Sequence, residues 1–264
     1  MSIFRKRKVA LALGGGAARG LANLGVLKVF EEERIPIDLV VGTSIGGLIG
    51  AAYCLGVPIG VMEKSALNFK LGKLVDLGLS NTAITKGKKL ARIVAEFTDK
   101  KTFADARIPF AITATDIETG DELVYTKGNL QDIVRASCSW PGIFPPVKIY
   151  GRKLADGGIR NSIPVKMARR LGATTVIAVD IGFCVRKGEI KNLIQMFIQS
   201  IQIMGEELDE YQSMQADIII KPKLTNIDQL AFNRAKEAIR EGEAAARKSI
   251  NAIRKKVGRV LWKR

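Results

Sequence analysis

The sequence predicts a single α/β domain, a sandwich in which a central, mostly parallel sheet is flanked by helices. Two short apolar runs, Val9–Leu13 and Ile37–Val41, alternate with two helical stretches, Ala17–Glu33 and Ile45–Leu55. This order is typical of a βαβ unit with parallel strands. The β-branched run Thr174–Ile181 predicts a further buried strand. The 264 residues, 47% apolar and 26% charged, fit one large globular domain spanning residues 1–264.

Shorter elements are expected through the rest of the chain. Strands are predicted at Pro109–Thr115, Glu122–Thr126, Val147–Tyr150, Arg152–Ala155 and Asp217–Ile220. Helices are predicted at Lys88–Phe97, Asn129–Ala136, Pro164–Leu171, Ile190–Tyr211 and from Ala235 onward. Three prolines within Cys138–Pro146 predict a loop.

The absence of histidine excludes several kinds of chemistry. The chain has no histidine, so a Ser-His-Asp triad, a His-ligated zinc and an imidazole base are all ruled out. The three cysteines, Cys54, Cys138 and Cys184, match neither a disulfide framework nor a metal-binding spacing. We expect free thiols in a reducing, cytoplasmic compartment, with no metal and no organic cofactor. No apolar segment approaches the length of a membrane-spanning helix.

The charge of the chain indicates anionic partners. The formal net charge is +16, and the predicted helical tail, residues 231–264, holds eleven basic and three acidic residues. An anionic membrane surface fits this balance, with the protein peripheral at the inner face of the membrane. Nucleic acid is not expected, because aromatic stacking platforms and a recognisable motif are both lacking. The tail either lies on lipid or packs on the core with its lysines solvated, and both readings stay open.

Two further segments have open alternatives. Residues 57–79 mix lysine with leucine and phenylalanine and lie where a cover over the site is conceivable. The apolar stripe of residues 190–211 is expected to pack in the core, with a dimer contact, an acyl-chain wall or a lid as alternatives. A homo-oligomer is left open.

The most informative motif is Gly42-Thr43-Ser44-Ile45-Gly46. This G-x-S-x-G lies between a predicted strand and a helix rich in small residues, which is the context of a nucleophile elbow. Gly42 and Gly46 allow a turn too tight for side chains on either flank, and the helix that follows presents the positive end of its dipole. The motif predicts that Ser44 is a nucleophile.

A glycine-rich segment, Gly14–Gly20, follows the first strand. It is not a dinucleotide fingerprint, because Arg19 occupies the sixth position, and not a P-loop, because Leu21 follows the last glycine. Parallel neighbouring strands would place this loop beside Ser44, where its N–H groups can stabilise an oxyanion.

A serine nucleophile needs a base. Because the chain has no histidine, a carboxylate is the remaining candidate. Asp156 ends a predicted strand and precedes Gly157 and Gly158, so it is the best-placed candidate. A free aspartate, with a pKa near 3.9, is a weak base. Asp156 therefore requires strong oxyanion stabilisation and partial desolvation. Taken alone, an Asp-Gly-Gly is more often a simple turn.

Taken together, GGGAARG, GTSIG and DGG resemble the patatin-like phospholipases, in that family's order and over a motif-bearing core of residues 8–180. The resemblance implies a serine acyl-ester hydrolase of the small bacterial single-domain type, forming an acyl-enzyme on membrane lipids without a catalytic histidine. It implies Ser44 as nucleophile and Asp156 as general base. It also implies an oxyanion hole from the backbone of Gly14, Gly15 and Gly16, with Arg19 as the family's basic residue in the glycine-rich box.

Two details of the resemblance complete these expectations. Ser137–Pro146 resembles the family's proline-rich loop, and Ala17 stands where many members have a fourth glycine. An alternative from a different class is a catalytically silent protein on the same fold that binds lipid or another anion in a regulatory role.

Overall fold

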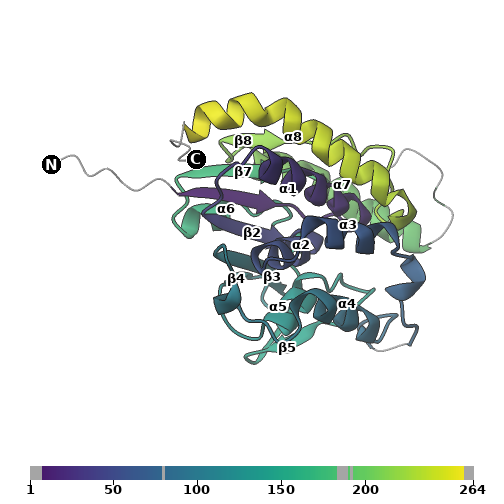
Figure 1. The fold of residues 1–264 in the computed structure, drawn as a ribbon. Helices are drawn as coiled ribbons and strands as arrows, with labels where there is room; N and C mark the ends of the chain where they lie inside the picture. Colours follow the sequence, from purple (N-terminus) through teal and green to yellow (C-terminus); the bar gives the residue numbers. More distant parts are fainter. Residues whose placement is uncertain (1–7, 79–80, 183–189, 191–192, 259–264) are drawn as a thin grey trace.

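The protein is built around one mixed sheet, seen in the computed structural model of Figure 1. The structure describes residues 8–78, 81–182, 190 and 193–258. Its strands are β1 (Val9–Leu13), β2 (Leu39–Thr43), β3 (Phe110–Asp116), β4 (Glu122–Tyr125), β5 (Val147–Ile149), β6 (Arg152–Asp156), β7 (Thr175–Val179) and β8 (Ile218–Ile220). The strand order is β5-β6-β3-β2-β1-β7-β8, and β4 pairs with β3. β3, β2, β1, β7 and β8 are parallel, whereas β4, β5 and β6 are antiparallel. The predicted α/β class with a mostly parallel sheet is confirmed.

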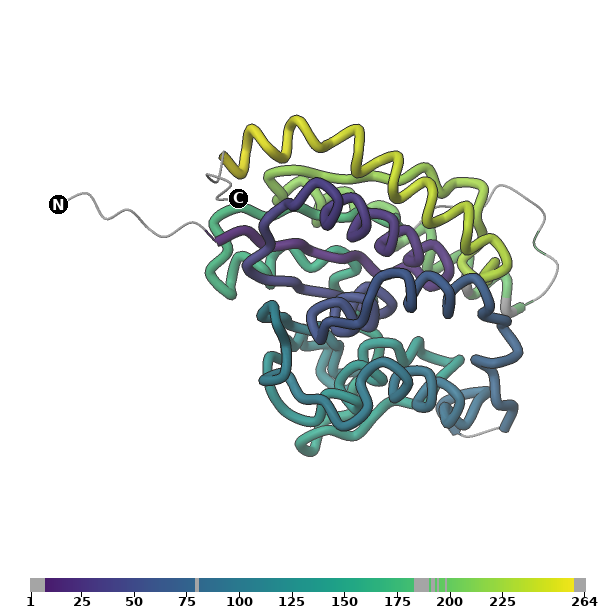
Figure 2. The backbone as a smooth tube through the Cα atoms, in the orientation of Figure 1, coloured from purple at the N-terminus to yellow at the C-terminus, as the bar shows by residue number. Residues whose placement is uncertain are grey.

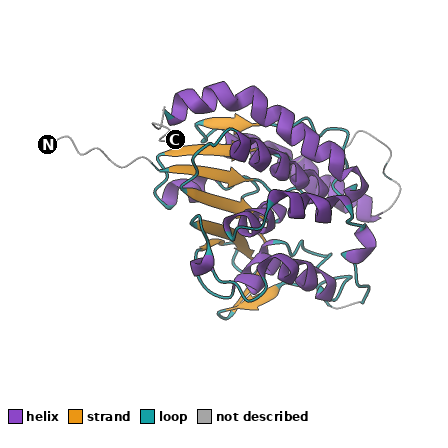
Figure 3. Ribbon diagram, in the orientation of Figure 1, coloured by secondary structure: helices purple, strands orange, loops and turns teal. Residues whose placement is uncertain are grey.

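Helices cover both faces of this sheet (Figure 3). They are α1 (Ala22–Glu32), α2 (Ile45–Cys54), α3 (Ile59–Leu67), α4 (Lys88–Thr98), α5 (Leu130–Ser137), α6 (Val165–Arg170), α7 (Leu193–Ser213) and α8 (Ala235–Val257). Five short 3₁₀ turns join them, namely η1 (Ala17–Leu21), η2 (Leu71–Lys73), η3 (Phe103–Asp105), η4 (Gly157–Ile159) and η5 (Phe232–Arg234). One face carries α1, α2, α5 and α8, and the other carries α6 with α7 against it.

The central strands are mostly apolar because both of their faces are covered. All residues of β1, β2, β3 and β7 are buried. In β1, Leu11 and Leu13 face the α1 side, whereas Ala10 and Ala12 face the α6 side. This alternation fixes which layer each strand residue supports.

Two of the element boundaries that differ from the sequence prediction lie in the first βαβ unit. The helix predicted from Ala17 begins as the 3₁₀ turn η1 and becomes α-helical only at Ala22. Positive φ angles at Gly16 (151°) and Ala17 (49°) make the entry too sharp for a regular α-helical turn. The second strand begins two residues later than predicted, at Leu39, because the Asp38 carboxylate accepts a 2.7 Å hydrogen bond from Val9 N–H.

The C-terminal helix α8 packs along α1 rather than standing apart (Figure 2). Its apolar stripe, including Ile239, Ile250 and Ile253, is buried in the core. The two helices approach so closely that a Cβ on Gly25 or Gly242 would overlap a backbone carbonyl of the other helix. For residues 235–257 the structure therefore shows packing on the core. The remaining tail residues, 259–264, lie outside the described residues.

The helix α7 has the opposite distribution, and the expectation that its apolar stripe packs in the core is wrong for the residues described. Its exposed apolar side chains are Leu193, Met196, Phe197, Ile203, Met204, Leu208 and Tyr211. Its buried face is polar and small: Gln202, Gly205, Asp209 and Ser213. Ile194 and Ile198 have side chains outside the description. No helix in the described part of the chain is both long and apolar enough to cross a membrane.

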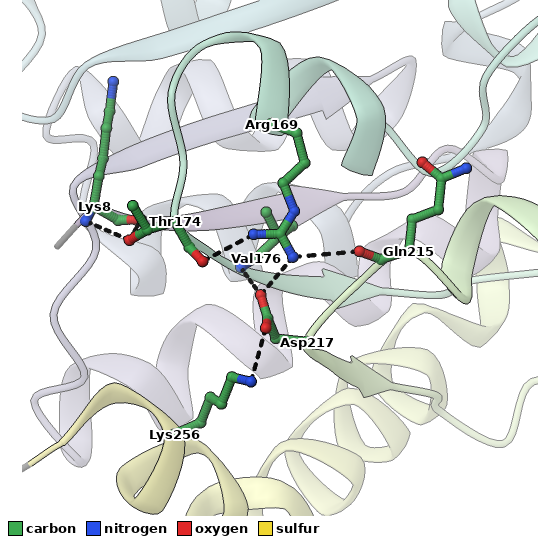
Figure 4. Close-up of polar contacts among 7 residues, drawn as sticks. All are labelled: Lys8, Arg169, Thr174, Val176, Gln215, Asp217 and Lys256. Atoms are coloured by element: carbon green, nitrogen blue, oxygen red, sulfur yellow. Dashed lines mark hydrogen bonds and ion pairs between the residues drawn. The ribbon is translucent and has the colours of Figure 1, made fainter. Parts of the chain in front are cut away.

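A polar cluster ties four elements together at the amino end of β7 (Figure 4). The Asp217 carboxylate accepts hydrogen bonds from Arg169 (2.6 Å), from Val176 N–H (2.8 Å) and from Lys256 (2.9 Å). Burial opposes the charge of Asp217, but these donors outweigh burial and hold its pKa below the ordinary value. Asp217 directly precedes β8, so the cluster connects β8 to α6, β7 and α8. These contacts anchor α8.

Candidate active site

The strand register brings the predicted nucleophile and base into one row. In the sheet, Thr43 of β2 is opposite Thr113 of β3, and Ala114 of β3 is opposite Asp156 of β6. Extending the β2 register by one residue aligns Ser44 with Ala114, and therefore with Asp156. The structure realises this geometry: Ser44 Oγ donates a 2.6 Å hydrogen bond to Asp156 Oδ2. The two residues are 112 positions apart in the chain.

Ser44 occupies a strained turn between β2 and α2. Its φ and ψ are 54° and −127°, values that a residue with a side chain rarely adopts. The flanking glycines are required sterically. A Cβ on Gly42 would lie 2.5 Å from the carbonyl oxygen of Gly46, and a Cβ on Gly46 would lie 2.6 Å from that of Gly14. The turn therefore presents the hydroxyl of Ser44 at the start of α2.

Ser137, at the end of α5, holds this turn in place. Its hydroxyl accepts a 2.8 Å hydrogen bond from Ser44 N–H, and its side chain is fully buried. The Ser137 hydroxyl thus satisfies the N–H of Ser44, which the turn directs away from any hydrogen-bonding partner on a strand. In the sequence, Ser137 stands out only as the first residue of the proline-rich segment. Its contact with Ser44 spans 93 residues, and no local signal reveals it.

The next residue, Cys138, places a thiol beside Ser44 and Asp156, and it is partly buried. Burial first, and the charge of Asp156 second, raise the pKa of the Cys138 thiol. Cys138 is therefore a neutral thiol at neutral pH.

The glycine-rich loop lies directly against Ser44. A Cβ on Gly15 would lie 3.3 Å from the Cβ of Ser44. Two of the three expected oxyanion donors are already engaged, because Gly14 N–H bonds to Val179 O at 3.2 Å and Gly15 N–H bonds to Ser162 O at 3.0 Å. These bonds fix the loop, but they leave the N–H groups of Gly14 and Gly15 unavailable to an oxyanion. Gly16, with its φ of 151°, is the remaining member of the expected trio.

Arg19 is buried behind the glycine-rich loop. Its Nε donates a 2.6 Å hydrogen bond to the carbonyl of Ile227, and its Nη1 donates a 3.3 Å bond to the carbonyl of Gly182. Only 1% of its surface is exposed. The guanidinium therefore braces the chain segments behind the loop.

Asp156 is held by few contacts in a desolvated position. Its Oδ1 accepts a 2.8 Å hydrogen bond from Gly158 N–H, and its own N–H donates to Ser139 O at 2.9 Å. Burial raises the pKa of Asp156 to about 6, while the hydrogen bonds from Ser44 and Gly158 lower it in part. The carboxylate is thus ionised at neutral pH, yet a stronger base than a solvated aspartate.

The potential metal ligands of the chain are dispersed. Across the ranges that the structure describes, no group of three or more His, Cys, Asp and Glu side chains is arranged to hold a metal ion. The dyad itself offers one carboxylate and one hydroxyl.

Fold and site together define a class: an α/β protein that presents a serine on a nucleophile-elbow turn beside a buried carboxylate. A family model described as patatin-like phospholipase matches residues 11–169. The chain belongs to the patatin-like phospholipase family.

Relatives of known name agree with this assignment. The chain is 38% identical over 189 residues to the human patatin-like phospholipase domain-containing protein 6, a match covering 66% of this chain and 13% of the human protein. It is 34% identical over 182 residues to lysophospholipase NTE1 of Phaeosphaeria nodorum, covering 67% of this chain and 12% of that protein. The chain thus spans about an eighth of the length of these relatives.

A solved structure supports the fold. The crystal structure of VipD from Legionella pneumophila matches with a TM-score of 0.59 at 12% sequence identity. The match covers 93% of this chain and 67% of the VipD chain. At this identity the likeness concerns the fold alone.

Proposed function

We propose that the protein is a serine acyl hydrolase of lipid esters, in which Ser44 is the nucleophile and Asp156 the general base. The observation that supports this proposal is the 2.6 Å hydrogen bond from Ser44 Oγ to Asp156 Oδ2, on a strained turn beside the glycine-rich loop. A hydroxyl that donates to a desolvated carboxylate is the arrangement needed for base-assisted attack.

The reaction proceeds in two halves. Ser44 Oγ attacks the ester carbonyl carbon while its proton passes to Asp156, giving a tetrahedral oxyanion. The Gly16 N–H and the amino end of α2 stabilise that charge. Collapse of the intermediate breaks the bond to the alcohol, which leaves with the proton from Asp156. Water then attacks the acyl-Ser44 ester with Asp156 again as base, releasing the fatty acid and restoring the hydroxyl.

A dyad suffices because a carboxylate has no tautomer to orient. A histidine base needs a third residue to select its tautomer, whereas Asp156 needs only a fixed position. Gly158 N–H and the pairing of β6 with β3 supply that position. The raised pKa of Asp156, about 6, brings the base closer to the pH at which it works.

The substrate class rests on the family. The relatives carry the names patatin-like phospholipase and lysophospholipase, and the chain aligns with about an eighth of each. From these names we propose that the substrate is a lipid ester and that the bond hydrolysed is a carboxylic ester. The charge of +16 favours substrates in an anionic surface.

A fluorophosphonate probe tests the nucleophile without assuming a substrate. We expect one adduct on the wild type by intact mass, and no adduct on Ser44→Ala. Ser249→Ala serves as the matched control, because that serine lies on α8 and donates to Ala245 O. Release of fatty acid from lysophospholipid should fall by about a thousandfold or more in Ser44→Ala.

Two results would contradict the proposal. An adduct that persists in Ser44→Ala would move the nucleophile elsewhere. A folded wild type that is neither labelled nor turns over any lipid ester, yet binds vesicles, would favour the catalytically silent lipid-binding alternative.

A further inference from the structure

A surface of lysines and leucines lies next to the candidate site. We call it the lysine–leucine rim and define it as residues 67–78 and 81–88, from the end of α3 through η2 to the start of α4. It folds back on itself, since Gly78 N–H donates to Ile84 O and Lys86 N–H donates to Asp76 O. In Figure 1 it lies on the side toward which the arrowheads of β1 and β2 point.

Hydrogen bonds connect the rim to the dyad through the proline-rich loop. Ile84 N–H donates to Gly142 O at 3.0 Å, and Thr85 Oγ1 donates to Ile143 O at 2.6 Å. The same loop includes Ser139, whose carbonyl accepts the hydrogen bond from Asp156 N–H. The rim is therefore joined to the loop that also contacts Asp156.

The rim presents apolar side chains to solvent. The exposed members are Leu67, Leu71, Leu77 and Ile84, and Leu77 is 80% exposed. Other rim residues are anchored inward: the Phe69 ring packs on Phe232 with centroids 4.9 Å apart, and Leu74 packs against the core. Because the anchors fix the backbone, the exposed leucines cannot turn inward without breaking these contacts.

The charge of the rim is positive. Lys70, Lys73, Lys86 and Lys88 are exposed, and Asp76 is the one acidic residue among the residues that define the rim. The Asp76 carboxylate is occupied, since it accepts hydrogen bonds from Gly87 N–H and Lys88 N–H at the start of α4. Burial opposes its charge, but the N–H groups at this helix end outweigh burial and lower the pKa of Asp76. The lysines thus face solvent without a competing acid.

Two other surfaces do not combine exposed apolar side chains with an excess of basic ones. The exposed apolar face of α7 is accompanied by exposed acids at Glu206, Glu207 and Glu210, which an anionic surface repels. The helix α8 is basic but has no exposed large apolar side chain. Interfacial binding draws on both apolar insertion and cationic attraction.

We propose that the lysine–leucine rim docks the protein on an anionic lipid bilayer, with its leucines in the acyl boundary and its lysines among the head groups. This inference rests on the proposed function, because docking there places Ser44 next to the ester layer of the bilayer. The basic face of α8 is then in contact with solvent rather than with the membrane.

Vesicle flotation tests the rim directly. The protein is used as the Ser44→Ala variant, so that no lipid is consumed, with phosphatidylcholine vesicles containing about 30% phosphatidylglycerol at about 0.1 M salt. Reversing two rim charges, Lys73→Glu with Lys86→Glu, should lower partitioning by at least about 25-fold. Leu77→Ser should lower it by about tenfold. Pure phosphatidylcholine vesicles should bind the protein weakly.

Matched variants on the other two surfaces are the controls. Lys248→Glu with Lys255→Glu makes the same charge change on exposed sites of α8. Leu193→Ser removes a leucine of α7 that is 83% exposed, close to the exposure of Leu77. Both should bind vesicles within about twofold of the parent. Thermal unfolding of each variant shows whether it is folded.

Three results would overturn the proposal. The first is that rim variants fold and float like the parent, and the second is that the α8 or α7 controls lose binding instead. The third is a dimer, detected by sedimentation, that Leu77→Ser dissociates, which would make the rim a contact between two copies. Flotation requires no turnover, so its failure is distinguishable from a failure of Ser44 to react with the fluorophosphonate.

Discussion

The two members of the dyad are held by different kinds of force. Ser44 lies on a turn whose glycines touch backbone atoms on both sides, so steric contact determines its position. Asp156 ends an antiparallel strand that joins the parallel sheet beyond β3, and two hydrogen bonds to its carboxylate hold it in a desolvated position. The proposed nucleophile is positioned by packing, and the proposed base by electrostatics.

This difference separates two kinds of mutational effect. Changes at the elbow should disturb folding and the maximal rate without moving the pH dependence. Changes at Asp156 should alter the pH dependence of both rate and stability. Three substitutions test this distinction.

The largest effect is expected for Gly46→Ala. The new Cβ would lie 2.6 Å from the carbonyl oxygen of Gly14 and would overlap that of Leu13, and neither backbone can yield easily. We expect a loss of about 3 kcal/mol or more of unfolding free energy and loss of activity. Urea unfolding measures the first quantity. Gly60→Ala on α3 is the control, because a Cβ there meets nothing within 4 Å, and it should be neutral or slightly stabilising. Equal stability of the two variants would contradict steric positioning.

The second prediction concerns Asp156→Asn and stability. Because burial raises the pKa of Asp156 from 3.8 to about 6, the native state holds a proton that the unfolded state has already lost between these pH values. The stability of the wild type therefore falls as pH rises through this window, by on the order of 3 kcal/mol. Asp156→Asn removes this dependence, so it should gain stability relative to the wild type above pH about 6, while losing about a thousandfold in kcat. Chemical denaturation at pH 4 and pH 8 checks the sign. A difference between the two proteins that does not change with pH would contradict it.

The smallest effect is expected for Ser137→Ala. The substitution leaves Ser44 N–H without its 2.8 Å acceptor, which weakens the elbow by about 1–2 kcal/mol. We expect kcat to fall about tenfold with little change in KM. The wild-type rate should rise with pH to a plateau with a midpoint near 6, the pKa of Asp156, and the variant should keep that midpoint. Ser139→Ala, whose hydroxyl bonds to Arg135 O, is the control. A shifted midpoint would show that Ser137 acts on the base.

Local patterns in the sequence predicted the α/β class and the individual motifs of the site. GTSIG, GGGAARG and the Asp-Gly-Gly each combine a turn with a strand end, and it was their joint resemblance to the patatin-like phospholipases that predicted the pairing of Ser44 with Asp156. The hydrogen bonds of Gly14 and Gly15 depend on Val179 and Ser162, far along the chain. Which of the expected N–H groups can still donate to an oxyanion therefore could not be predicted without the three-dimensional structure.

The helix α7 shows a second limit of sequence patterns. Its residues form an apolar stripe and a polar stripe, both with helical spacing. The apolar stripe predicted the inward face, yet Gln202 and Asp209 are buried while Phe197 and Met204 are exposed. Periodicity identifies the faces of a helix, but the neighbours decide which face is covered.

The contact between α1 and α8 has a consequence for the order of events during synthesis. The helix α1 follows directly from the glycine-rich loop, and it packs against α8, which comes much later in the chain. Until residues 235–257 leave the ribosome, the backbone groove at Gly25 has no occupant and the side of α1 that α8 covers is exposed to water. A nascent chain already contains Ser44 and Asp156 long before then. Completion of the fold around the loop beside Ser44 therefore waits until α8 has been translated.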